Sequence, residues 1–283
     1  MATIYLFPGQ GSQSKGMGED LFDEYPELVG KADSILGYSL KTLCLEDPEG
    51  NLNQTQYTQP ALFAVSALEY LSHTKETGEK PDFLAGHSLG EYTALFAAGA
   101  FDFETGIRLV RKRGELMGKA KGGGMAAVIG IDANRVREIL ECAGVETVQV
   151  ANYNSPQQTI LSGPVKDLDQ ISETFTKGGA RRYIPLKVSA AFHSRYMDEA
   201  GKAFGDFLKT VELDDPKTPV VSNVTARPYE SGEIADNLEK QITSSVRWQE
   251  SVEYLLAQGE CAFKEIGPGT VLTKLVQQIQ QAT

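Results

Sequence analysis

The 283-residue sequence predicts an α/β fold in which a small ferredoxin-like unit is inserted into a larger α/β region. Strand-like apolar runs alternate with helical patterns along most of the chain, which favours a layered α/β architecture. After residue 124 this rhythm changes to the order β-α-β-β-α-β of the ferredoxin-like unit. The length fits one large domain that carries an insertion. We therefore expect a large subdomain formed by residues 1–124 and 193–283 and an inserted subdomain of residues 125–192.

The large subdomain is predicted from short apolar runs and longer amphipathic ones. The runs "IYLF" and "PDFLAG" are typical of buried strands, whereas "SALEYLSHTK" and "LGEYTALFAAGAF" are typical of helices. The stretch "FETGIRLVRKRGELMGKAK" predicts a basic amphipathic helix, and the three glycines at 122–124 predict a hinge. Beyond residue 193, helix and strand patterns alternate again up to "VLTKLVQQIQ".

The inserted subdomain is predicted from six consecutive patterns. The strand "MAAVIGI" is followed by the helix "DANRVREILECAG", with Asp132 as its N-cap and Gly144 as its stop. Two strands, "VQVANYN" and "QQTILSG", then join around Asn154-Ser155-Pro156. The helix "VKDLDQISETFTKGG" and the strand "RRYIPLKVS" complete the unit.

The composition indicates a globular enzyme of the cytoplasm. The hydrophobic fraction is 41% and the charged fraction 23%. The net charge of -11 argues against nucleic acid and anionic membranes, so an acidic partner would need a locally basic patch. Cys44, Cys142 and Cys261 fit neither a disulfide framework nor a zinc site, and they favour a reducing compartment. We find no signal-peptide pattern and no window that approaches a membrane span.

A glycine-rich loop follows the first predicted strand in "IYLFPGQGSQSKGMG". The P-loop pattern fails because Gly11 and Gly16 are followed by Met17 and Gly18. The dinucleotide pattern G-x-G-x-x-G fails because Ser14 occupies its last position. Two interpretations remain open at this point: a plain tight turn, or a loop that presents backbone N–H groups to something other than a phosphate.

The stretch from Gly86 to Gly90 forms a G-x-S-x-G motif between a predicted strand and a predicted helix. This is the context of a nucleophile elbow and makes the large subdomain α/β-hydrolase-like. Glycines flank Ser88 because the turn is too tight for side chains. The helix N-terminus directs free N–H groups toward charge that develops beside the serine. The alternative is a glycine-rich turn with an incidental serine.

A serine nucleophile needs a base, and the chain contains three histidines. His87 adjoins Ser88 on a sharp turn, so its side chain should point away, and His73 lies on an earlier predicted helix. His193, in "KVSAAFHSRYM", remains by elimination, although a lone histidine is more often structural. No acidic residue identifies itself as a third member of a triad.

Arg113 lies one predicted helix beyond the serine, in "RLVRKRGELM". Its guanidinium forms a rigid fork that suits a carboxylate. The alternative is a solvated basic face. We prefer that alternative for the neighbouring basic residues Arg108, Arg111, Lys112, Lys119 and Lys121.

Together these residues resemble the malonyl-CoA:acyl carrier protein transacylases, including the acyltransferases of polyketide synthases. The similarity begins at "FPGQGSQ" and continues through "TQPAL", "GHSLGEY", "RG-x-x-M" and "AN-x-NSP…SG". It ends with "AFHS", "SNVTA" and "EIGPG", and so covers nearly the whole chain in order.

The resemblance implies a role for each matched position. Ser88 would carry the acyl group as an ester, and His193 would activate it. The main-chain carbonyl of Gln241 would hold the histidine, which would explain the missing acid. Arg113 would pair with the free carboxylate of a malonyl group.

The resemblance also implies that the backbone N–H groups of Gln10 and Leu89 form an oxyanion hole, which would explain the glycine-rich loop. Leu89 and Phe192 match the malonyl-preferring variants of the family, with simple packing as the alternative. Other matched positions line the family's cleft, and each could equally be a buried amide that satisfies backbone groups: Gln59, Asn154 and Asn223.

The implied reaction transfers a malonyl group from malonyl-CoA to the phosphopantetheine thiol of an acyl carrier protein. We expect no metal and no cofactor beyond these substrates, and we expect a monomer. The stretch "AAFHS" favours a polyketide enzyme that acts in trans, with housekeeping fatty-acid synthesis as the runner-up. The competing classes are an esterase or carrier-protein thioesterase and a non-catalytic carrier-docking module. Candidates to meet CoA phosphates or an acidic carrier are Arg108, Arg111, Lys112, Arg181, Arg182 and Lys187.

Overall fold

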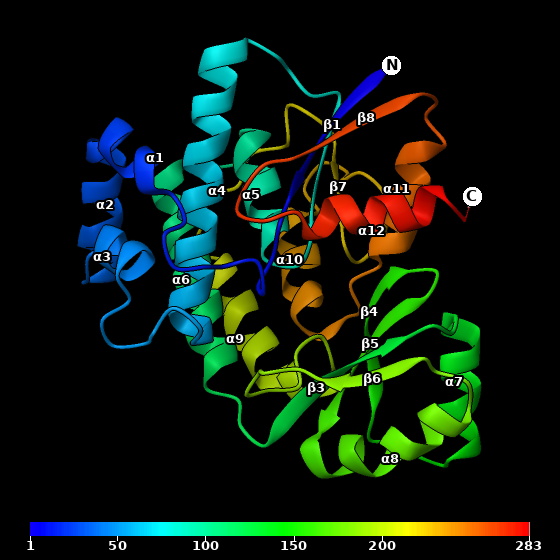
Figure 1. Cartoon of the computed structure of the whole chain (residues 1–283). Helices are drawn as coiled ribbons and strands as arrows, with labels where there is room; N and C mark the ends of the chain where they lie inside the picture. The colour runs from blue at the N-terminus through cyan, green and yellow to red at the C-terminus, as the bar shows by residue number, and fades with distance from the viewer. Residues whose placement is uncertain (283) are drawn as a thin grey trace.

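Two separate four-stranded sheets organise residues 1–282, the part of the chain that the computed structural model describes (Figure 1). The strands are β1 (Ala2–Phe7), β2 (Phe83–Gly86), β3 (Gly123–Ile129), β4 (Gln149–Ser155), β5 (Gln158–Pro164), β6 (Arg182–Pro185), β7 (Val220–Val221) and β8 (Cys261–Glu265). The helices before β3 are α1 (Glu19–Glu24), α2 (Pro26–Leu36), α3 (Leu40–Leu45), α4 (Thr55–Thr77), α5 (Gly90–Ala97) and α6 (Phe103–Gly118). The later helices are α7 (Ala133–Cys142), α8 (Val165–Lys177), the 3₁₀ turn η1 (Arg195–Met197), α9 (Asp198–Leu208), α10 (Ile234–Thr243), α11 (Trp248–Leu256) and α12 (Val271–Gln280).

The first sheet is parallel, has the order β7-β2-β1-β8, and is covered by helices on both faces. Successive side chains of β1 point to opposite faces because the strand period is two. Tyr5 and Phe7 join the core formed with α4, α5, α6 and α9. Ile4 and Leu6 join a second core formed with α11 and α12. Burial on both faces explains why the strand is a continuous apolar run.

The second sheet is antiparallel, has the order β4-β5-β3-β6, and is the ferredoxin-like unit expected from the sequence. Ala126 and Val128 pack with α7 and α8, whereas Met125 and Ala127 join the main core on the other face. Asp132 caps α7 by accepting from the N–H of Arg135, as predicted. The α/β class and the antiparallel unit are therefore confirmed, and the boundaries at residues 125 and 192 stay a prediction.

Two of the three glycines expected to form a hinge before the second sheet belong to that sheet. Gly123 and Gly124 begin β3 and pair with Pro164 and Gly163 of β5. A Cβ on Gly123 would lie 2.5 Å from the backbone nitrogen of Ala191. These glycines therefore serve close packing between two chain segments rather than flexibility.

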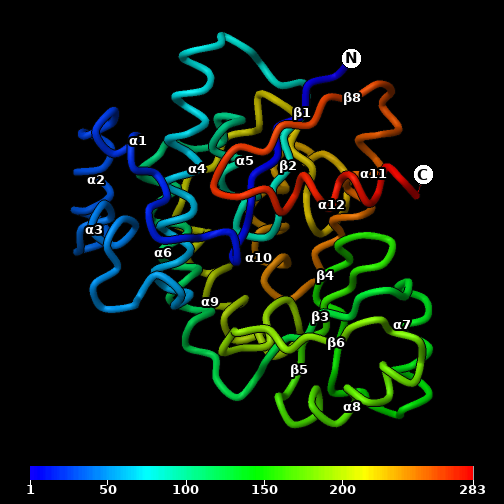
Figure 2. The backbone as a smooth tube through the Cα atoms, in the orientation of Figure 1, coloured from blue at the N-terminus to red at the C-terminus, as the bar shows by residue number. Residues whose placement is uncertain are grey.

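The path of the chain shows how the second sheet joins the first. In Figure 2 the green segment leaves the part built around β1, forms the unit of β3 to β6 with α7 and α8, and returns through α9 and α10. Strand β4 contacts the first part, because the backbone N–H of Tyr153 donates to the carbonyl oxygen of Val246. No helix within residues 1–282 combines the length and apolar character that a membrane span requires.

Candidate active site

Ser88 lies at the end of β2, on the turn that leads into α5, as the sequence predicted. Its φ of 52° is in the left-handed region, which is strained for any residue other than glycine. A Cβ on Gly86 would lie 2.0 Å from the backbone of Gly90, and one on Gly90 would lie 2.0 Å from the carbonyl oxygen of Phe7. Only glycines fit on either side of the serine, so the motif is a consequence of the tight turn.

The structure brings His193 to Ser88 from a segment 105 positions later in the chain. The serine Oγ lies 2.8 Å from the histidine Nε2, and the histidine Nδ1 lies 2.8 Å from the carbonyl oxygen of Gln241. Because a carbonyl only accepts, Nδ1 carries the proton and Nε2 is free to accept from the serine hydroxyl. Burial, with a contribution from Arg113, lowers the pKa of His193 to about 3. The imidazole is therefore neutral and in its basic form at physiological pH.

Arg113 reaches the same serine from α6 and is 1% exposed. Its Nη2 donates to Ser88 Oγ at 3.1 Å and to Gln241 Oε1 at 2.9 Å. The guanidinium lies 5.3 Å from the ring centre of Tyr92, and its Nε has no partner among the described residues. Burial lowers the pKa of Arg113. Within residues 1–282 no carboxylate pairs directly with this buried cation, which leaves it able to bind an anionic ligand.

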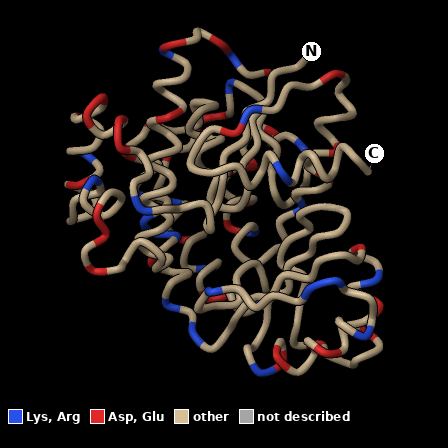
Figure 3. The backbone as a smooth tube through the Cα atoms, in the orientation of Figure 1, with Lys and Arg blue, Asp and Glu red and all other residues tan. Residues whose placement is uncertain are grey.

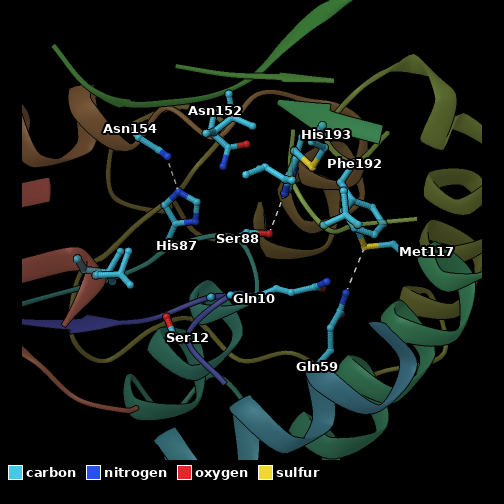
Figure 4. A pocket seen from close by; sticks show the side chains of 18 of the residues that line it. Gln10, Ser12, Gln59, His87, Ser88, Met117, Asn152, Asn154, Phe192 and His193 are labelled. Atoms are coloured by element: carbon cyan, nitrogen blue, oxygen red, sulfur yellow. Dashed lines mark hydrogen bonds between the residues drawn. The ribbon is translucent and has the colours of Figure 1, made fainter. Parts of the chain in front are cut away.

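A cavity of about 220 Å³ surrounds these three side chains (Figure 4). Its wall combines apolar side chains, among them Met117, Phe192 and Leu275, with polar ones. Two buried amide oxygens in the wall, Gln59 Oε1 and Asn152 Oδ1, have no partner among the described residues. The cavity therefore brings together a nucleophile, a cation, unused hydrogen-bonding groups and apolar side chains.

The glycine-rich loop after β1 forms one side of this cavity through Gly9, Gln10 and Gly11. A Cβ on Gly9 would lie 2.3 Å from the carbonyl oxygen of His87, so the loop approaches the serine turn backbone to backbone. Within residues 1–282 no hydrogen-bond acceptor is found for the backbone N–H of Gln10 or of Leu89. Both groups are therefore free to serve the oxyanion role that the resemblance implies.

His87 and Asn154 form a pair beside the nucleophile. His87 Nε2 lies 2.8 Å from Asn154 Oδ1, and the imidazole is directed away from Ser88, as expected (Figure 4). Asn154 Nδ2 donates to Gln158 Oε1 at 3.0 Å. Both residues line the cavity. Both ends of the Asn154 amide are thus bonded to protein groups. The residue therefore contributes to the shape of the cavity wall rather than a free hydrogen-bonding group.

Asn223 lies behind the serine turn rather than in the cavity wall. Its Oδ1 accepts from the backbone N–H of Ser88 at 2.6 Å, and its Nδ2 donates to the carbonyl of Gly86 at 2.7 Å. The side chain is 1% exposed. Of the two interpretations in the sequence analysis, this geometry favours a buried amide that satisfies backbone groups.

Two polar side chains at this site and one contact were not predicted from the sequence. Glu91 is fully buried three residues after the nucleophile, and burial raises its pKa to about 7. Asn152 lines the cavity above Ser88. The Gln241 side chain bonds Arg113, Glu91 and the carbonyl of Ser88. The signals were present in the matched stretches "GHSLGEY" and "AN-x-NSP".

Comparison with known proteins supports the resemblance. The model of the acyl transferase domain family matches residues 4–282. The polyketide biosynthesis malonyl CoA-acyl carrier protein transacylase BaeC of Bacillus velezensis is 52% identical over 99% of this chain and 97% of its own length. The polyketide biosynthesis protein PksE of Bacillus subtilis is also 52% identical, but the chain spans only 36% of it. The malonyl CoA-acyl carrier protein transacylase of Bacillus subtilis is 42% identical over 98% of this chain and 90% of its own length.

Solved structures agree with the sequence comparisons. The crystal structure of malonyl CoA-acyl carrier protein transacylase from Burkholderia pseudomallei has a TM-score of 0.97 at 47% identity, covering 100% of this chain and 99% of that one. A malonyl-transacylase in complex with a type II polyketide acyl-carrier protein has a TM-score of 0.94 at 38% identity, covering 99% and 94%. The chain therefore belongs to the acyl transferase family and, within it, to the malonyl CoA-acyl carrier protein transacylases.

Proposed function

We propose that this enzyme transfers a malonyl group from malonyl-CoA to the phosphopantetheine thiol of an acyl carrier protein through an ester on Ser88. One observation carries the proposal. Ser88 Oγ lies 2.8 Å from a neutral histidine nitrogen and 3.1 Å from a buried arginine nitrogen, inside one cavity. A nucleophile next to an unpaired cation suits an acyl group whose far end is a carboxylate.

In the first half-reaction, Ser88 Oγ attacks the thioester carbonyl while its proton moves to His193 Nε2. The tetrahedral oxygen takes the negative charge, and the N–H groups of Gln10 and Leu89 are the donors assigned to it. When the C–S bond breaks, His193 returns the proton to the CoA sulfur. The Gln241 carbonyl keeps the imidazole in the required tautomer and stabilises its transient charge.

In the second half-reaction, the thiol of the carrier gives its proton to His193 and attacks the Ser88 ester. Collapse of the new tetrahedral intermediate breaks the C–O bond, and the serine oxygen recovers the proton from the histidine. The apolar wall of the cavity shields the ester from water, which favours transfer over hydrolysis.

Arg113 accounts for the choice of acyl group. A carboxylate at the malonyl terminus would give the guanidinium a charged partner that the protein does not supply within residues 1–282. An acetyl group leaves the guanidinium unpaired. Because a buried charge without its partner is unfavourable by several kcal/mol, the site should select dicarboxylic acyl groups. We assign Phe192, Gln59 and Asn154 to the wall that shapes the acyl and thioester positions.

We propose that the enzyme acts in the cytoplasm as a separate protein that loads the carrier proteins of a polyketide synthase in trans. The discrete polyketide relative BaeC is 52% identical, whereas the general transacylase of Bacillus subtilis is 42% identical. The three cysteines are free, which suits a reducing compartment. Figure 3 shows basic positions on β6 and in the segment between α6 and β3. Both segments are next in the chain to residues that line the cavity, Leu186 after β6, and Met117 and Met125 on either side of the other segment. We assign the acidic carrier to this side, where the candidates are Arg181, Arg182 and Lys187 in and next to β6, and Lys112 on α6.

The test is covalent labelling followed by transfer. Incubation with malonyl-CoA should add one malonyl group to the peptide that contains Ser88, and Ser88→Ala should show no addition. Adding a panel of polyketide and fatty-acid carrier proteins should discharge the label onto a carrier thiol faster than into water. A label on another residue contradicts the mechanism, and release mainly as free malonate indicates a hydrolase.

A further inference from the structure

The steps above leave unused a buried carboxyl group, Glu91 on α5. It is 0% exposed and lies one helical turn beyond Ser88. Its Oε1 accepts from the Tyr229 hydroxyl and from the backbone N–H of Asn223 at 3.2 Å. Its Oε2 accepts from Gln241 Nε2 at 2.5 Å. Within residues 1–282 three groups donate to this carboxyl group, and these hydrogen bonds favour its ionised form, whereas burial favours its protonated form.

Gln241 connects this carboxylate to the reactive groups. Its Nε2 donates to Glu91 Oε2 and to the carbonyl oxygen of Ser88 at 2.9 Å, and an ionised carboxylate and a carbonyl both act only as acceptors. The amide can therefore take one orientation, with Oε1 turned toward Arg113 Nη2 at 2.9 Å. Glu91 thus fixes the polarity of the amide that orients the guanidinium.

The same chain of contacts places one negative charge opposite one positive charge. Among the titratable groups that face Glu91, Tyr229 follows β7 and Tyr92 lies on α5, and burial raises both of their pKa values. His193, beside Arg113, is held neutral by a lowered pKa. Above the pKa of Glu91, the charges among the described residues of this cluster are those of Glu91 and Arg113. Glu91 is therefore the counter-ion that the protein supplies to Arg113, and the Gln241 amide lies between the two charged groups.

We propose that Glu91 is a positioning residue that orients and charge-balances Arg113 through Gln241, so that a carboxylate arriving at Arg113 is accompanied by a proton binding to Glu91. This inference rests on the proposed role of Arg113. The second carboxylate would give the cluster two negative charges and one positive charge. One solvent proton then joins a Glu91 oxygen, and no other bond changes.

The direction of the pH dependence follows from this balance. Malonyl binding takes up a proton, so it is favoured where protons are abundant, and it weakens as the pH rises above the pKa of Glu91 in the free enzyme. Burial places that pKa at about 7, with donors and Arg113 opposing the rise. The malonyl carboxylate itself stays ionised above pH 5.5. Uptake of one proton changes the binding constant by up to about tenfold per pH unit.

The experiment compares kcat/KM for acyl loading from malonyl-CoA and from acetyl-CoA between pH 5.5 and 9. Both donors use Ser88, His193 and the same CoA, so the malonyl-to-acetyl ratio isolates events at Arg113. In the wild type the ratio should fall as the pH rises. In Glu91→Gln it should be flat. In Tyr229→Phe the carboxylate stays but loses one donor, so the fall should move to higher pH.

Three outcomes overturn the inference: a wild-type ratio that does not change with pH, a Glu91→Gln ratio that keeps the wild-type slope, or a Tyr229→Phe profile that does not move. If Glu91→Gln does not fold, the wild type and Tyr229→Phe decide by themselves. The Arg113→Ala variant distinguishes a failure of the role proposed for Glu91 from a failure of the role proposed for Arg113. A collapsed ratio in that variant with a flat wild-type profile removes only the role of Glu91, whereas an unchanged ratio removes the proposed role of Arg113.

Discussion

Replacing Arg113 by alanine tests the acyl selectivity that the cavity implies. The guanidinium is 1% exposed and bonds only uncharged partners, Ser88 Oγ at 3.1 Å and Gln241 Oε1 at 2.9 Å. Its Nε has no partner among the described residues. A malonyl carboxylate would therefore be its one direct charged partner. Arg113→Ala leaves that carboxylate buried without a cation.

The magnitude follows from the cost of breaking a buried charge pair by removing one partner, about 2–5 kcal/mol. At about 1.4 kcal/mol per factor of ten, malonyl loading should slow by about 30- to 4,000-fold in kcat/KM. The loss of the bond to Ser88 Oγ affects every donor equally. It therefore cancels in the ratio of malonyl to acetyl loading, which should fall by the full factor.

The assay is competitive loading of the enzyme with malonyl-CoA and acetyl-CoA, read by intact-protein mass. Arg108→Ala is the matched control, because Arg108 lies on the same helix with a side chain 57% exposed, and its one ion pair among the described residues is with Glu104 at 3.7 Å. The control should keep the wild-type ratio. A ratio in Arg113→Ala within about threefold of the wild type would refute the assignment of the carboxylate to this residue.

Three further predictions concern the support of the site. Asn223→Ala leaves the N–H of Ser88 and a neighbouring carbonyl buried without partners, so thermal unfolding should report a loss of about 2–4 kcal/mol and malonyl labelling should slow. Gly90→Ala places a Cβ 2.0 Å from a backbone oxygen and should abolish labelling or soluble expression, whereas Gly30→Ala on α2 meets nothing within 4 Å and should be neutral or stabilising in the same assays. In the folded protein the pKa of His193 is about 3, so the unfolded chain binds this proton more readily and stability should fall as the pH drops below 6.5. His193→Asn should flatten this dependence in thermal scans. An equal slope in both proteins would contradict the buried neutral imidazole.

The sequence predicted those parts of the site whose physical cause is local. The serine turn is recognisable because its tightness demands Gly86 and Gly90 within two residues of Ser88. His193 was reached by elimination among three histidines, and the contact with Ser88 spans 105 positions. The role of Glu91 was not predicted, because an acidic residue in the first turn of a helix is common. Only the fold sets it against Gln241, 150 positions away.

The helices between residues 19 and 45 were not predicted from the sequence, although part of the signal was present. In α2, Val29, Ala32 and Leu36 are buried at helical spacing, Pro26 occupies the first turn, and Gly37 ends the helix with a φ of 81°. The flanking helices α1 and α3 have six residues each, too short for a periodic pattern to stand out. The positions of α1 and α3 depend on packing against α4, and a local sequence pattern does not contain this information.

The backbones of Ser88 and His193 explain why the amide side chains of Asn223 and Gln241 are buried beside them. Ser88 and His193 both have left-handed backbones, with φ values of 52° and 55°. Such conformations persist where neighbouring contacts over-determine them. Asn223 holds the N–H of Ser88, and Gln241 holds its carbonyl with the side chain and the imidazole of His193 with the main chain. The reactive geometry therefore depends on two amides that never need to touch substrate, and changes there should slow chemistry for every acyl group alike, in contrast to changes at Arg113.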